Sequence, residues 1–238
     1  GGTNAHVVVQ EAPPPRESTP SSREAQLLVV SGRTRKATDR NAQRLAEHLQ
    51  ANPEVDLADV AWTLKVGRRE FEHRRVVVAS STEEAAHLLA ENDRQRVFTH
   101  TRVEKPSCVF MFPGGGAQST GMGRDLYDRE PVFREHVDAG LAAFAHHSDA
   151  DLRACLFPEA GREAELEADL ARTSMQLPAI FIVSYAMAKL LESWGIEPAA
   201  AIGHSLGENT AATLAGVFSF SEAVGLVALR GRLTERIE

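Results

Sequence analysis

The feature that most constrains this chain is a Gly-x-Ser-x-Gly stretch, residues 203–207, close to its C-terminal end. A short apolar run over 199–202 leads into it, and an Ala-rich helical pattern over 210–215 follows it. A strand, a sharp turn and a helix in that order form a nucleophile elbow. The serine there sits in a strained turn, and the flanking glycines avoid clashes between strand and helix. We therefore predict Ser205 as a catalytic nucleophile.

The same turn predicts an anion site beside the serine. It lifts the hydroxyl to a helix N-terminus, where the backbone N–H of Leu206 can face a developing oxyanion. The alternative is a glycine-rich turn without chemistry, because Gly-x-Ser-x-Gly alone is a short and common pattern. The flanking segments have to decide between the two interpretations.

Length and composition narrow the class of protein. The 238 residues allow one large domain or two modest ones, and a hydrophobic content of 43% is typical of globular proteins. A net charge of −7 argues against a nucleic-acid-binding surface. Cys108 and Cys155 lie far apart and form no disulfide framework or metal-binding spacing, which fits a reducing compartment. Without an apolar run of membrane-spanning length or a signal peptide, we expect a soluble, cytoplasmic protein with no metal and no membrane contact.

The N-terminal part predicts a segment, a linker and a small α/β unit. Residues 1–6 followed by Val7–Val8–Val9 indicate a tight turn feeding a strand, as at the end of a preceding domain. Residues 11–22 have the proline-rich composition of a linker. From 26 to about 104 the pattern predicts strands at 27–30 and 76–79. It also predicts three helices, the last opened by a capping box of Ser81 and Glu84.

A second α/β unit begins at Ser107. Residues 108–112 predict a buried strand, and 113–118 form a loop of nearly bare backbone that ends at Gln118. No Lys-Ser/Thr pair follows the loop, so it is not a P-loop; a glycine loop beside an oxyanion site fits better. The segments after Asp125, around 163–169 and over 177–194 are expected to be packing elements.

A last helix begins at Ser219, with Glu222 completing a capping box, and carries Arg230. Such an arginine can extend its charge to water, which is the commoner case. The alternative is a bidentate contact with a carboxylate held near Ser205, for which lysine is a poor substitute. The residue alone does not decide between them.

The nucleophile also needs a base. In the elbow architecture the acid and the histidine follow the serine, but residues 206–238 contain neither His nor Asp. His204 belongs to the turn itself. We therefore expect that the sequence stops partway through its catalytic domain.

These features together resemble a modular type I polyketide synthase across the junction from ketosynthase to acyltransferase. By this resemblance, 1–12 is the tail of a ketosynthase domain, and 13–104 is the small α/β linker domain between ketosynthase and acyltransferase. Residues 105–238 are then the first part of an α/β-hydrolase-like acyltransferase large subdomain, left incomplete. The matching stretches are 1–9, 57–64, 67–74, 112–118, 176–194, 203–208 and 227–232.

The resemblance implies a ping-pong acyl transfer. Ser205 would take a malonyl-type acyl group from coenzyme A and pass it to the phosphopantetheine thiol of an acyl carrier protein. Arg230 would pair with the free carboxylate of the substrate, and no bound cofactor is implied. The ketosynthase of the same polypeptide would be a further partner.

The resemblance also assigns supporting roles in the loop and the elbow. The backbone N–H groups of Leu206 and Gly115 would form the oxyanion hole, with Gln118 and His204 in support. The family's loop usually reads Gly-Gln-Gly, and Gly115 stands at the glutamine position, which a backbone donor tolerates and a side-chain role does not. The family's histidine and the motif that reports the extender unit would lie beyond Glu238. We therefore expect this stretch alone to be inactive.

Two other functions compete with this one. A non-catalytic linker or docking module between ketosynthase and acyltransferase is favoured by residues 13–104 and by the missing base. A self-contained serine hydrolase has only the elbow in its support.

Overall fold

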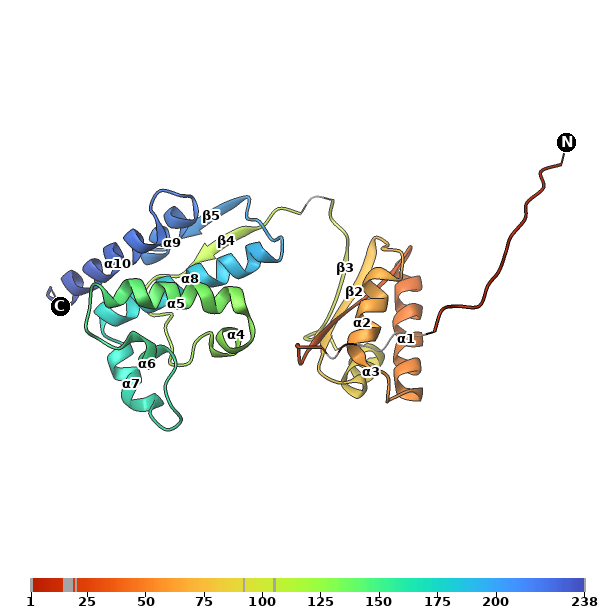
Figure 1. Ribbon diagram of the computed structural model, residues 1–238, viewed down its shortest axis with the longest axis horizontal. Coiled ribbons are helices and arrows are strands. Elements are labelled where there is room, and N and C mark those ends of the chain that lie inside the picture. The colour runs from red at the N-terminus through yellow and green to blue at the C-terminus, as the bar shows by residue number, and fades with distance from the viewer. Residues whose placement is uncertain (1, 15–18, 20, 92, 105, 238) are drawn as a thin grey trace. The chain divides into compact units, whose positions relative to one another are not determined.

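The computed structural model describes residues 2–14, 19, 21–91, 93–104 and 106–237, and the chain divides into two compact units, Gly1–Glu104 and Lys105–Glu238 (Figure 1). Residues 2–14 contain no helix or strand, so the strand expected at Val7–Val9 was wrong for this chain. The three valines are 82–95% exposed, and no strand among the described residues pairs with them. The tight turn predicted over 1–6 is likewise absent from residues 2–6, while Gly1 and part of the predicted linker, 15–18 and 20, lie outside the described residues.

The first unit is built on an antiparallel sheet in the order β1 (Gln26–Gly32), β2 (His73–Ala79), β3 (Val97–Thr101). Leu28 lies opposite Val77 in the register, and both side chains are fully buried. The preceding residue on β1, Leu27, points to the opposite face of the sheet and is 55% exposed. The sheet is therefore covered on one face. The first two strands are as predicted, whereas β3 was not.

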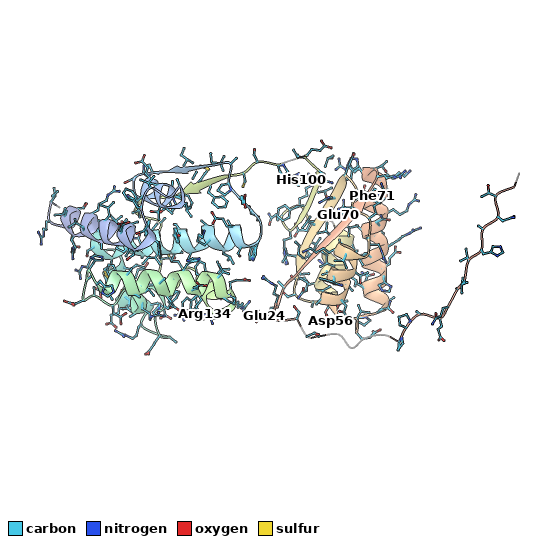
Figure 2. All side chains as sticks on the ribbon, turned by 45° about the horizontal axis from the view of Figure 1, so that its top comes forward. Glu24, Asp56, Glu70, Phe71, His100 and Arg134 are labelled. Atoms are coloured by element: carbon cyan, nitrogen blue, oxygen red, sulfur yellow. The ribbon has the colours of Figure 1, made fainter. Side chains whose placement is uncertain are left out.

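Three helices cover the buried face of this sheet: α1 (Arg35–Ala51), α2 (Leu57–Val66) and α3 (Thr82–Glu91). Asp56, which Figure 2 labels, caps α2 by accepting a hydrogen bond from the Ala58 N–H at 2.7 Å. The capping box predicted for α3 forms only in part. Ser81 Oγ accepts from the Glu84 N–H, but the Glu84 carboxylate bonds to the Ser80 N–H instead of completing the reciprocal pair. All three helices were predicted from apolar spacing.

The second unit joins two parallel strands to seven helices within the described residues. Strands β4 (Val109–Phe112) and β5 (Ala200–Gly203) pair in register, with Phe110 beside Ala201. The helices are α4 (Arg124–Arg129), α5 (Pro131–Ala145), α6 (Leu152–Leu156), α7 (Glu163–Leu170), α8 (Thr173–Ser193), α9 (Leu206–Leu214) and α10 (Phe220–Glu235). The two strands are far apart in the sequence but run parallel, so their C-terminal ends lie at the same edge of the sheet. The 113–118 loop follows β4 and the Ser205 turn follows β5, and both therefore lie at this edge.

The buried strand predicted over 108–112 is buried on one side only. Phe110 and Phe112 are 8% exposed, whereas Val109 is 53% and Met111 78% exposed. The reason is geometric: alternate side chains of a strand point to opposite faces, and the helices cover one face of this pair.

Helix α8 forms the centre of the second unit. It begins four residues before the predicted start, contains Pro178 in its first turns and packs against α5 and α10 (Figure 1). Contrary to expectation, an 18-residue stretch of this 21-residue helix has a mean hydropathy of 1.4, which satisfies the length and composition of a membrane span. However, 56% of that stretch is buried inside the unit, as in the core helix of a soluble protein. Trp194, the last residue of the segment 177–194 expected to pack, is 49% exposed just after the helix.

Candidate active site

The turn between β5 and α9 holds Ser205 in a strained conformation. Its φ is 51° and its ψ −103°, and it is the one non-glycine residue with positive φ in the part of the chain that the structure describes. Such backbone states cost about 1–3 kcal/mol and persist where the surroundings enforce them. The strand, turn and helix predicted around this serine are therefore present, with the serine exposed to solvent.

Two glycines allow the backbones around the serine to approach one another. A Cβ on Gly203 would lie 2.0 Å from the carbonyl carbon of Gly207, and one on Gly207 would lie 2.2 Å from the Phe112 carbonyl oxygen. Neither distance is tolerable for a carbon atom, and in both cases the obstacle is backbone. The strand and helix around Ser205 therefore pack at a distance that only glycine permits.

Helix α10 carries Arg230 to the serine. Its start is fixed by the predicted capping box of Ser219 and Glu222, which is fully formed. At its other end, Glu235 accepts hydrogen bonds from Arg172 at 3.1 Å and from the Ser174 N–H at 3.2 Å. The first turn of α8 is thereby tied to α10, and Arg230 lies one turn before this tie.

The Arg230 guanidinium bridges the turn and α9. Its Nη2 donates to Ser205 Oγ at 2.8 Å, and its Nη1 donates to Asn209 Oδ1 at 2.9 Å. The side chain is half-buried. The sequence left two positions open for the Arg230 charge, in water or near Ser205. The guanidinium lies beside the serine and does not extend freely into water. Both acceptors are neutral, so the guanidinium keeps its full positive charge next to the hydroxyl.

The 113–118 loop lies beside the same turn. The His204 imidazole packs closely on Gly114. A Cβ on Gly114 would come within 2.6 Å of the imidazole Nδ1, so only glycine leaves room for the ring. The Gln176 amide lies in the same way over Gly115, and Gln118 Oε1 accepts the Gly116 N–H at 3.1 Å. The loop and the elbow are thus brought together, while the Gln118 side chain folds back onto its own loop.

Leu206 is the first residue of α9, and its buried side chain holds this turn against the core. The first N–H groups of a helix have no acceptor within the helix. The next two, of Gly207 and Glu208, donate to the carbonyls of His204 and Ser205. The Leu206 N–H is thus the helix-terminal donor adjacent to Ser205, where negative charge is favoured.

Two histidines of the second unit have contacts other than the serine. His136 packs edge-on against the Tyr185 ring at 5.6 Å, and His147 lies against Gly225 on α10. Burial lowers the pKa of His136 below its ordinary value. Among the described residues, the hydrogen-bond partner of Ser205 Oγ is Arg230, which stays protonated and cannot serve as a base.

Two residues of this site were missed by sequence reasoning, Asn209 and Gln176. Asn209 could have been found, since it follows Ser205 by four positions and therefore lies on the same face of a helix. The position of Gln176 over Gly115 depends on the packing of α8 beneath the loop, and no local signal indicates it.

Both units match families of known proteins. Residues 109–238 match the family described as acyl transferase domain, and residues 26–89 match the family described as CurL-like, PKS C-terminal. The chain is 40% identical over 241 residues to erythronolide synthase EryA3 of Saccharopolyspora erythraea, covering 99% of this chain and 7% of that protein. It is 37% identical over 249 residues to a phenolphthiocerol/phthiocerol polyketide synthase of Mycobacterium tuberculosis, covering 98% of this chain and 16% of that protein.

Two solved structures are similar to the fold. The acyl transferase domain of ZmaA is 40% identical, with a TM-score of 0.86 over 92% of this chain and 50% of that one. The acyl transferase domain of SpnD, solved in complex with 2-(pent-4-yn-1-yl)malonyl, is 38% identical with a TM-score of 0.76, covering 88% of this chain and 49% of that one. The chain thus spans about half of each solved domain and a small part of the two curated relatives.

Proposed function

Because this chain belongs to the acyl transferase domain family and its relatives are modular type I polyketide synthases, we propose that Ser205 accepts and transfers an extender-unit acyl group. The donor would be a malonyl-type coenzyme A thioester, and the acceptor would be the phosphopantetheine thiol of an acyl carrier protein. The observation that supports this most is the 2.8 Å contact between Ser205 Oγ and Arg230. It brings a nucleophile and a carboxylate-binding cation into one site.

The proposed reaction has two halves. Ser205 Oγ attacks the thioester carbonyl as a base takes its proton, and the carbonyl oxygen becomes an oxyanion that the N–H groups of Leu206 and Gly115 stabilise. The C–S bond then breaks, and coenzyme A leaves as a thiol after protonation. The carrier-protein thiol attacks the serine ester in the same way, which forms a new thioester and restores the hydroxyl. Gln118 and His204 would hold the loop and the turn around this centre.

Arg230 would select for the acid group of the substrate. A guanidinium can bind a carboxylate through two parallel N–H donors, which gives orientation as well as energy. The SpnD domain, solved with a substituted malonyl group, supports an acyl group of this class for this chain as well.

We also propose the assignment of the whole chain. Residues 1–12 would be the end of a ketosynthase domain, 13–104 the linker domain and 105–238 the first half of the acyltransferase, in a cytoplasmic synthase. Since Ser205 meets a cation and no base among the described residues, we expect the 238 residues alone to transfer acyl groups slowly. Loss of the base from such a catalytic unit lowers the rate by orders of magnitude.

Intact-mass measurement of the chain after exposure to malonyl-coenzyme A tests this function, with Ser205→Ala as the control. We expect no adduct, or a slow one, from the 238 residues alone. A malonyl adduct that is dependent on Ser205 is expected once residues from the second half of a related acyltransferase domain are supplied. An adduct that persists in Ser205→Ala, or none even then, would contradict the proposed nucleophile. Rapid turnover of simple esters would favour a self-contained hydrolase instead.

A further inference from the structure

We propose that Asn209 is a positioning residue that orients the Arg230 guanidinium while leaving its positive charge free for the substrate carboxylate. This inference rests on the proposed function of Ser205 and Arg230. It adds a residue that neither the motif pattern nor the resemblance assigned to the site.

The geometry gives Asn209 a single neutral contact with the arginine. Its Oδ1 accepts from Nη1 at 2.9 Å while Nη2 donates to Ser205 Oγ at 2.8 Å. Two fixed acceptors determine the plane of a planar guanidinium, and both acceptors lie on the same face of α9 and its preceding turn. Asn209 is half-buried, so its amide is held beside the arginine by the surrounding helix.

The helix itself fixes where the amide can reach. Thr213 Oγ1, near the end of α9, donates to the Asn209 carbonyl one turn earlier at 2.7 Å. On the arginine side, Thr234 Oγ1 donates to the Arg230 carbonyl at 3.0 Å. Both residues therefore lie within regular helices, and the Asn209–Arg230 contact joins α9 to α10.

The chemical identity of the acceptor decides what the arginine can do. A carboxylate at this position would form an ion pair with Arg230 and would compete with an incoming acid group for the same donors. It would also repel that acid group, since like charges at short range disfavour one another. An amide oxygen orients the guanidinium by a hydrogen bond alone. Asparagine therefore suits a site whose cation must be held in place and still bind an anion.

A binding experiment separates this role from a merely structural one. It uses the full 238-residue chain with Ser205 retained, because the serine hydroxyl is one of the two acceptors of Arg230, and it measures binding over times at which intact mass shows no acylation. It compares malonyl-coenzyme A with acetyl-coenzyme A, which has no free carboxylate. We expect Asn209→Ala to raise the Kd for malonyl-coenzyme A about fivefold, and Asn209→Asp to raise it about twentyfold or more. Acetyl-coenzyme A should be unaffected. Asn41→Ala, which removes a side-chain hydrogen bond of 3.0 Å in the other unit, is the matched control and should change neither value.

The outcomes distinguish the two proposals. If Arg230→Ala leaves the preference for malonyl-coenzyme A intact, or no variant binds it, the proposed function fails. If Arg230→Ala abolishes the preference but Asn209→Asp binds as tightly as the parent, the positioning role is overturned. Equal weakening of both thioesters by Asn209→Ala would also overturn it.

A second measurement does not depend on any ligand. In nitrogen-15 NMR spectra, the Arg230 Nη groups should rotate slowly while they are held by two acceptors. Their signals, assigned by their loss in Arg230→Ala, should show faster rotation in Asn209→Ala than in the parent chain. Unchanged rotation would overturn the positioning role.

Discussion

Arg75 of the first unit and Arg230 of the second each lie within a polar cluster, and the two clusters differ in the charge of the acceptors. In the first unit, Arg75 Nη2 donates to the Asp39 carboxylate at 2.6 Å and Nε donates to Thr99 Oγ1 at 3.0 Å. The Arg75 side chain is only 6% exposed. In the second unit, Arg230 is half-buried and bonds to the neutral oxygens of Ser205 and Asn209.

The difference teaches how to tell a structural cation from one that is available to a ligand. A buried guanidinium needs a counter-charge, because removal from water is costly for an unpaired ion. Arg75 has this counter-charge in the carboxylate of Asp39. Arg230 is close to solvent and can remain charged without a carboxylate partner. A cation held by neutral acceptors beside a strained serine is the arrangement that a substrate anion can complete.

The largest effect should come from removing the counter-charge in the first unit. Asp39→Ala leaves Arg75 buried with Thr99 as its side-chain partner among the described residues, and we expect the free energy of unfolding of this unit to fall by about 2–3 kcal/mol. Hydrogen exchange of peptides from β2 reports on this unit separately from peptides of α8. Asp39→Asn, which keeps a neutral acceptor like that of Arg230, should lose less. Equal stability of all three chains would mean that Arg75 needs no counter-charge.

Adding a carboxylate beside Arg230 in the second unit should raise the free energy of unfolding, by less than the loss of Asp39 lowers it in the first unit. Asn209→Asp adds a carboxylate to Arg230, and we expect the unit to gain about 0.5 kcal/mol, as for a partly exposed ion pair. Hydrogen exchange of peptides from α9 and α10 measures the gain, with Asn209→Ala as the uncharged control. A stability loss in Asn209→Asp would show that the amide N–H₂ group, and not only its oxygen, is needed where it lies.

Much of the fold was predictable because its signals are local. The capping box of Ser219 and Glu222 and the close approach of Gly203 to Gly207 each act within one turn of the chain. Strand β3 was missed because its five residues carry little alternation, and its place depends on pairing with β2. The exposure of Met111 was missed for a related reason, since burial depends on which elements cover each face.

The candidate site was predictable in its parts but not in its contacts. Ser205 follows from the elbow pattern alone. The sequence left Arg230 undecided, and only the resemblance favoured the serine; the distance between them depends on how α10 packs on α8. The catalytic roles of Leu206, Gly115, Gln118 and His204 stay predictions, because the geometry gives their positions and not their chemistry.

The smallest effect we expect is a dependence on pH of the stability of the second unit, through His136. His136, on α5 of the second unit, has its pKa lowered from the ordinary 6.5, first by burial and also by Lys189, while Glu135 and Glu192 act in the opposite direction. A histidine with a lowered pKa in the folded state binds fewer protons there than in the unfolded chain. Its contribution to stability is therefore complete above about pH 6.5 and is lost as the pH falls through the lower folded value.

Hydrogen exchange of α5 and α8 peptides between pH 7 and pH 5, corrected for the intrinsic exchange rate, measures this loss in the second unit. His136→Phe keeps a ring against Tyr185 and removes the titrating group, so we expect its unfolding free energy to vary less with pH than that of the parent chain. His100→Gln, at an exposed position on β3 of the first unit, is the control and should leave the pH dependence of α5 and α8 unchanged. A His136→Phe chain that loses as much stability in mild acid as the parent would show that another group of this unit takes up the proton.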